Sequence, residues 1–460
     1  MPRLYRFVPA AGHGLAACLL AVVTLAVLAS VSQGPAEARV FDPETFTLDN
    51  GLQVVVVTNR RAPIVTHMVW YKVGAADEAA GESGNAHFLE HLMFKGTDKL
   101  GPGEFSHIIA LNGGRENAFT SYDFTGYYQT VARDRLEIVM QHEADRMANL
   151  RLTDEVVLPE REVVLEERRS RVDNNPGGKL REMIQASLFL NHPYRIPVIG
   201  WEHEIHELST ETALAFYRRW YAPNNAVLIV GGDITAAELR PLAEKHYGVV
   251  PARAVPERKR VAEPPQHAPR RLTLKSPQVS QPGISISYLA PSYGSADSEH
   301  TYALQILDEI LSGGATSRLY RGLVVEQAVA ASAGSGYRAT AYDLGTFDFH
   351  ASPRPGGDIN ELEAALRAEI ARLLEGGVTE AEVAAAKRRL RAAAIFARDS
   401  LGTGPNIFGR ALTTGQSVAD VESWPERIEA VTVEQVDAAA HAVFLDNRSV
   451  TGLLLPAESG

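Results

Sequence analysis

Residues 84–97 read GNAHFLEHLMFKGT, and His87, Glu90 and His91 stand in this stretch at positions i, i+3 and i+4. Residues three and four apart lie on the same side of an α-helix, so a helix here would bring the two imidazoles and the carboxylate together. Two neutral imidazoles are common zinc ligands, and a carboxylate beside them exchanges protons from outside the coordination shell. The stretch therefore predicts a metal-binding helix.

A third ligand is needed, because a catalytic zinc site has three protein ligands and one open position. Residues 159–169 read PEREVVLEERR, an acidic stretch that is predicted to be helical. Glu160 and Glu167 are two helical turns apart and share a face. Glu166 is the rival ligand, since adjacent helical residues point about 100° apart and only one of the two can face the metal.

Four motifs in this order and spacing resemble the pitrilysin/insulinase family of zinc peptidases. They are residues 84–97, GGRENAFT at 113–120, the acidic stretch from Glu160 to Glu167, and HPY at 192–194. The inverted order H-x-x-E-H is itself a zinc-peptidase signature. The similarity runs from about residue 46 to about residue 454 and is closest to the two-domain branch that includes the mitochondrial processing peptidase. Asn85 departs from the family, which more often has Thr or an aliphatic residue there.

The resemblance implies a ligand set and a reaction. In the family the third ligand follows the second His by 76 residues, which is Glu167 here, and a supporting Glu, here Glu160, precedes it by seven. The chain is thus expected to be a zinc metalloendopeptidase with one Zn²⁺ held by His87, His91 and Glu167. The fourth position is left for water, and Glu90 is expected to serve as the general base.

The resemblance also assigns a role to Asn117, Ala118 and Phe119, in a segment that otherwise indicates an ordinary edge strand. In the family this strand runs beside the zinc and pairs its backbone with an extended peptide substrate. The remaining histidines, His142 and His192 among them, are expected to be surface or core residues. Two alternatives remain open: a non-catalytic assembly or binding subunit of the same family, and another zinc hydrolase such as a thioether-cleaving enzyme.

Composition narrows the class of protein. The chain has 460 residues, of which 45% are hydrophobic. This length is sufficient for two ordinary domains and too great for a single hydrophobic core. Its net charge of −11 argues against nucleic acid or an anionic membrane as the main partner. Cys18 is the only cysteine and precedes the predicted mature chain, so a thiol nucleophile is excluded.

Residues 1–38 are predicted to be a secretory signal peptide. Arg3 and Arg6 precede an apolar run at residues 15–29, and Ala36-Glu37-Ala38 gives an A-x-A cleavage pattern before Arg39. The run is short for a membrane span, so export to the periplasm or medium is favoured over an uncleaved membrane anchor.

The mature chain is predicted to contain two homologous domains. Residues 251–271 are rich in Pro and Arg and indicate a linker between residues 39–250, the catalytic zinc-binding domain, and residues 272–460. A pattern of N-cap, Ala-rich helix, Asn and strand recurs with a constant offset of 223 residues, with Ser209 and Thr432 as the caps.

The periodicity predicts an α+β fold in which each domain is a mainly antiparallel sheet with helices packed on one face. The predicted strands are residues 52–58, 64–73, 127–132, 283–290 and 345–351, and the predicted helices are residues 84–94, 133–149, 300–311 and 361–374.

The second half repeats neither H-x-x-E-H nor the acidic pair, so it is expected to be non-catalytic. In family members that cleave peptides, the domain facing the zinc supplies an Arg and then a Tyr that hold the substrate carbonyl. Thr346 stands where the Arg is expected, unless Tyr337, Tyr342 or Arg354 substitutes. The resemblance therefore implies a homologous non-catalytic partner subunit in a heterodimer, with a homodimer as the other possibility.

Overall fold

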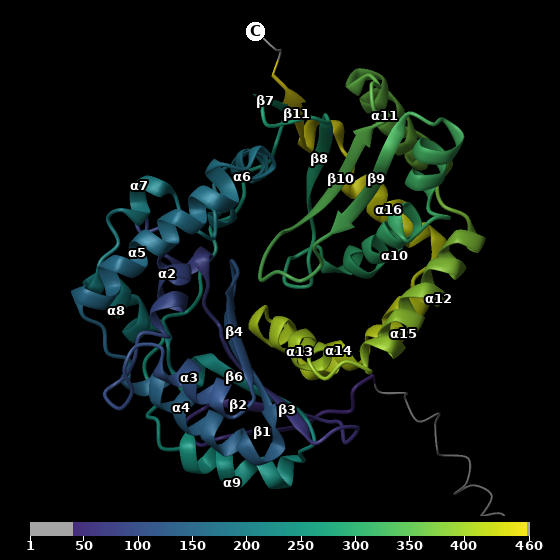
Figure 1. The fold of residues 1–460 in the computed structure, drawn as a ribbon. Helices are drawn as coiled ribbons and strands as arrows, with labels where there is room; N and C mark the ends of the chain where they lie inside the picture. Colours follow the sequence, from purple (N-terminus) through teal and green to yellow (C-terminus); the bar gives the residue numbers. More distant parts are fainter. Residues whose placement is uncertain (1–39, 458–460) are drawn as a thin grey trace, which may run out of the picture. The chain divides into compact units, whose positions relative to one another are not determined.

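The computed structural model describes residues 40–457, so the predicted signal peptide lies outside the described residues. The fold is α+β, as predicted, and is built around two sheets (Figure 1). No helix among residues 40–457 is both long enough and apolar enough to span a bilayer.

The first sheet has six strands in the order β1-β2-β6-β3-β5-β4, and all neighbouring pairs are antiparallel except β2 and β6. Strand β4 lies at one edge and, within residues 40–457, has a hydrogen-bonded neighbour on only one side. The bounds are β1 Glu44–Thr47, β2 Gln53–Thr58, β3 Ile64–Tyr71, β4 Arg115–Thr120, β5 Thr125–Ala132 and β6 Ala226–Gly232.

The second sheet has five strands in the order β7-β11-β8-β10-β9, and only β7 and β11 are parallel. Each sheet is therefore mainly antiparallel, and each gains a parallel pair from a strand late in its half. The bounds are β7 Arg270–Ser276, β8 Gly283–Ala290, β9 Ala330–Tyr337, β10 Gly345–Pro353 and β11 Ser449–Pro456.

The two capped helices of the predicted repeat are present, one in each half of the chain. Ser209 and Thr432 cap α8 and α16, each side-chain oxygen accepting a hydrogen bond from the backbone N–H three residues on. In the first half the helices are α2 Asn85–Leu92, α3 Glu104–Leu111, α4 Leu136–Asn149, α5 Asp154–Arg168, α6 Pro176–Leu188, α7 Glu202–Ile205, α8 Thr210–Trp220 and α9 Ala236–His246. In the second half they are α10 Thr301–Ser312, α11 Ile359–Gly376, α12 Glu380–Ala397, α13 Thr403–Thr413, α14 Val418–Glu422, α15 Trp424–Ala430 and α16 Val433–Val443.

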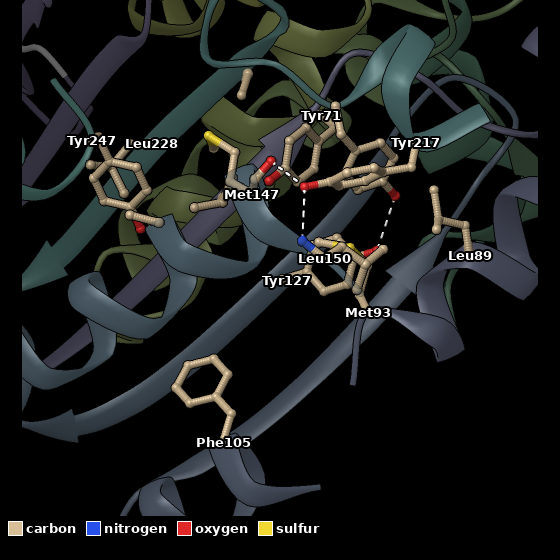
Figure 2. Close-up of a cluster of buried hydrophobic side chains, with 14 of the residues drawn as sticks. Tyr71, Leu89, Met93, Phe105, Tyr127, Met147, Leu150, Tyr217, Leu228 and Tyr247 are labelled. Atoms are coloured by element: carbon tan, nitrogen blue, oxygen red, sulfur yellow. Dashed lines mark hydrogen bonds between the residues drawn. The ribbon is translucent and has the colours of Figure 1, made fainter. Parts of the chain in front are cut away.

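Helix α2 is fixed by burial of its apolar side. Phe88, Leu89 and Leu92 have no exposed surface and pack into the core of the first half. Figure 2 shows Leu89 in this cluster, which also includes Tyr127 and Tyr217. Burying a large apolar side chain contributes roughly 1.5–3 kcal/mol, so the three residues hold the predicted metal-binding helix firmly in place.

The opposite face of each sheet is covered by a helix from the other half. Helix α13 packs on the first sheet, where Phe408 joins a buried cluster with Trp70. A Cβ at Gly409 would lie 2.0 Å from the indole ring of Trp70, so this close approach requires glycine. Helix α6, which belongs to the first half, packs on the second sheet through Leu180 and Ile184. The prediction of helices on one face of each sheet therefore holds for the helices of the same half. The other face of each sheet is covered by a helix from the other half.

Candidate active site

The start of helix α2 is set by its surroundings. Gly84 has φ 88°, and a Cβ there would lie 2.5 Å from the carbonyl oxygen of Ile199, so both backbone and space call for glycine. The carboxylate of Glu78 accepts hydrogen bonds from the N–H groups of Gly84 and Ala86. Asn85, the departure from the family pattern, is fully buried and donates to the carbonyl of Thr212.

His87, His91 and Glu167 come together where α2 meets α5. Their ligand atoms all lie within 4.8 Å of one another, the one such group of three found in the described part of the chain. Nε2 of His87 is 3.7 Å from Oε1 of Glu167, and Nε2 of His91 is 3.3 Å from Oε2 of Glu167. Glu166 points elsewhere: its side chain is 71% exposed and pairs with Arg169.

The donor set fits zinc, because two imidazole nitrogens and one carboxylate are a usual catalytic ligand combination. Burial, and then the neighbouring His91, lowers the pKa of His87 to about 4, which keeps its imidazole neutral. Burial also lowers the pKa of His91, but hydrogen bonds to Glu160 and Glu167 outweigh this effect and raise it to about 9. His91 must therefore release a proton when it binds a metal.

Glu160 supports His91 from behind. Its Oε1 lies 2.9 Å from Nδ1 of His91, which leaves Nε2 of that ring for the metal. Its Oε2 pairs with Lys95 at 2.5 Å. Burial raises the pKa of Glu160, but hydrogen bonds with His91 and Lys95 outweigh it and lower the pKa below its usual value. An anionic carboxylate on the far nitrogen is the usual way to orient a zinc-binding histidine.

Glu90 lies on the same face of α2 and is 9% exposed. Burial raises the pKa of its carboxyl group, partly offset by a hydrogen bond from Thr120. The hydroxyl of Thr120 donates to Oε2 at 2.5 Å. A carboxylate with a raised pKa beside a metal site is well suited to take up and return a proton.

The predicted substrate strand is β4, whose outer edge pairs with no other strand of the described part of the chain. Phe119 packs against Trp70 and against Gly126 of β5, so its ring belongs to the core. Ala118 is half-buried against the other face, while Asn117 is exposed. Substrate recognition by β4 would therefore use its main chain, as expected for strand addition.

The histidines set aside as structural lie away from this group. His192 is fully buried, accepts from the N–H of Tyr194 and lies 3.3 Å from the carboxylate of Asp343. It thereby links the two halves of the chain. His142 lies against the ring of Phe105.

Three neighbours of the site were missed in the sequence. Thr120 bonds to Glu90, Lys95 to Glu160 and Arg171 to Glu167, the last pair at 2.6 Å. Lys95 and Arg171 each lie four residues after a predicted site residue, so helical spacing could have indicated them. Thr120 ends the motif at residues 113–120, in the strand that the resemblance places beside the zinc, but its contact with Glu90, 30 residues away, was not predicted.

Comparison with known families accounts for both halves. Residues 53–201 match the insulinase family (peptidase family M16), and residues 207–390 match the peptidase M16 inactive domain. The chain belongs to peptidase family M16. The zinc protease PqqE of Helicobacter pylori is 32% identical to this M16 chain over 421 residues, which are 90% of this chain and 93% of that protein.

Solved structures agree with this assignment. The crystal structure of a protease from Helicobacter pylori has a TM-score of 0.84 and 30% identity, and the match covers 90% of this M16 chain and 99% of that one. The periplasmic protease PqqL from Escherichia coli has the same fold, with a TM-score of 0.77 at 21% identity. That match covers 90% of this chain and 47% of that one.

Proposed function

We propose that this M16 chain is an exported zinc metalloendopeptidase that hydrolyses peptides or unfolded segments of proteins. One observation carries the proposal: His87, His91 and Glu167 converge within 4.8 Å, on the face of α2 that also bears the buried carboxylate of Glu90. The names of related chains, such as the zinc protease PqqE of Helicobacter pylori, support zinc and proteolysis.

In the proposed reaction, each part of the site has a separate role. When bound, zinc supplies a Lewis acid that lowers the pKa of water to roughly 7 and polarises the scissile carbonyl. Glu90 takes the proton from the attacking water and later gives it to the leaving amine. Glu160 keeps the ring of His91 in place through Nδ1. The free edge of β4 holds the peptide in an extended form.

The test is hydrolysis of a peptide mixture by the mature chain, with and without a chelator. Cleavage that stops with the chelator and returns with zinc is expected, because the proposed ligands must hold the metal for the reaction. Cleavage that is indifferent to the chelator would contradict the proposal. If the chain binds zinc but cleaves no peptide, whichever partner chain is added, a non-catalytic subunit would be favoured instead.

We further propose that full activity requires a second, homologous chain that lacks the zinc ligands. Thr346, where an Arg is expected, is 6% exposed and its hydroxyl donates to Asp348. The three possible substitutes have other contacts: Tyr337 donates to the carbonyl of Pro291, Arg354 donates to the carbonyl of Val324, and the ring of Tyr342 lies under Arg258. That this chain covers about half of PqqL is compatible with such a pair.

The isolated chain should therefore bind zinc and hydrolyse peptides slowly, and addition of the homologous chain should raise turnover. The residues that hold the substrate carbonyl lower the transition-state barrier, so their absence should cost mainly kcat. Steady-state rates with and without the partner measure this. Full turnover by the isolated chain would rule out the need for a heterodimer.

Export is also part of the proposal, from the pattern in residues 1–38. Mass spectrometry of the periplasmic or secreted protein should find an N-terminus at or near Arg39. Intact residues 1–38 on protein recovered from the membrane fraction would instead support an anchor.

A further inference from the structure

The hydroxyl group of Thr120 is placed to control the orientation of Glu90. It donates to Oε2 of Glu90 at 2.5 Å, and among residues 40–457 it is the one group found to hydrogen-bond to this carboxylate. A hydrogen bond to one carboxylate oxygen fixes the rotation of the group and leaves the second oxygen for another proton donor. A hydroxyl does this without adding a charge beside the general base.

Thr120 is itself held in a fixed place. It is the last residue of β4, and the turn that follows is closed by a hydrogen bond from the N–H of Ser121 to the carbonyl of Phe124. The N–H groups of Ala75 and Ala76 donate to the carbonyls of Ser121 and Tyr122. The turn therefore cannot shift without breaking several backbone hydrogen bonds.

One buried arginine pairs both with the same turn and with the neighbouring segment that donates hydrogen bonds to it. Arg260, from the segment predicted as a linker, lies 2.6 Å from Asp77 and 3.1 Å from Asp123, and all three side chains are at most 5% exposed. Arg258 also donates to the backbone carbonyl of Asp123. Breaking a buried pair leaves an uncompensated charge, which is strongly destabilising, so these contacts make the turn rigid.

We propose that Thr120 is a positioning residue for the peptidase reaction: its hydroxyl fixes Oε2 of Glu90 and leaves Oε1 as the oxygen that exchanges the proton. The inference rests on the proposed function. Thr120 also ends the strand whose edge is proposed to hold the substrate, so one rigid element sets the place of both the peptide and the general base.

Thr120→Val removes the hydroxyl and keeps the shape of the side chain, and Thr120→Ser keeps the hydroxyl. We expect kcat to fall about 10- to 100-fold in Thr120→Val, because small displacements of a catalytic group have effects of this size. KM should change less than about threefold and zinc content should stay at the wild-type level. Thr120→Ser should recover most of the lost kcat. Thr120→Ala tests the same loss if the Val variant does not fold.

Thr130→Val is the matched control. Thr130 lies on the neighbouring strand β5, is also half-buried, and its hydroxyl bonds to Thr66 rather than to the site. This variant should keep the wild-type kcat. An unchanged kcat in Thr120→Val, or a Ser variant as slow as the Val variant, would overturn the proposal.

Crystal structures of the zinc-bound wild type and Thr120→Val give a readout that is independent of turnover. Glu90 should keep one carboxylate orientation in the wild type and leave it, or adopt several, in the variant. A Glu90 that stays in place would refute the inference. If the wild type hydrolyses no peptide even with its partner, the proposed function fails while the crystal structures still decide whether Thr120 positions Glu90.

Discussion

Glu90→Gln should lower peptide turnover by about 10²–10⁴-fold, the usual contribution of a positioned general base. The Gln side chain has the same shape and its oxygen still accepts a hydrogen bond from Thr120, but it cannot take a proton from water. Zinc content should remain at about one per chain, because Glu90 lies outside the proposed ligand group. Steady-state kinetics and elemental analysis of the same preparation measure the two effects.

Glu166→Gln is the control for this variant. It removes a negative charge from the same region, but from a side chain that is exposed and paired with Arg169. Its turnover should match the wild type. Near-normal turnover in Glu90→Gln would remove Glu90 from the mechanism, and loss of zinc together with activity would show that it acts on the metal site instead.

Glu167→Gln should lose zinc. The change removes the one negative charge among the three ligands and leaves two imidazoles, so the affinity should fall by more than the roughly 10- to 100-fold that loss of an outer-shell partner costs. Glu160→Gln should show that smaller loss, because Glu160 touches His91 and lies outside the ligand group. Titration with a competing chelator measures both affinities.

Glu166→Gln again provides the comparison, since it differs from Glu167→Gln by one position along the same helix. It should bind zinc as tightly as the wild type. Zinc loss in Glu166→Gln with retention in Glu167→Gln would shift the proposed third ligand by one residue.

Local structure was largely predictable. Strand β8 covers the predicted residues 283–290, and α11 extends the predicted 361–374 by two residues at each end. The caps at Ser209 and Thr432 were also correct. Such features depend on the periodicity of side chains along a helix or strand and on hydrogen bonds within one helical turn. Both can be recognised from neighbouring residues in the sequence.

The choice between Glu166 and Glu167 shows where local pattern stops being sufficient. Both residues lie on α5, and helical periodicity alone cannot say which face turns toward α2. The resemblance to a family favoured Glu167, and the packing of α5 brings that side chain to the two histidines.

The helix that carries His87, Glu90 and His91 could be predicted from local order alone, because residues three and four apart lie on one face of an α-helix. The hydrogen bond from Thr120 to Glu90, and the packing of α13 from the second half on the first sheet, became visible only in the folded chain. These contacts join segments that no local rule connects. They arise because buried apolar faces and polar groups must each find partners, and packing of the whole chain selects which ones.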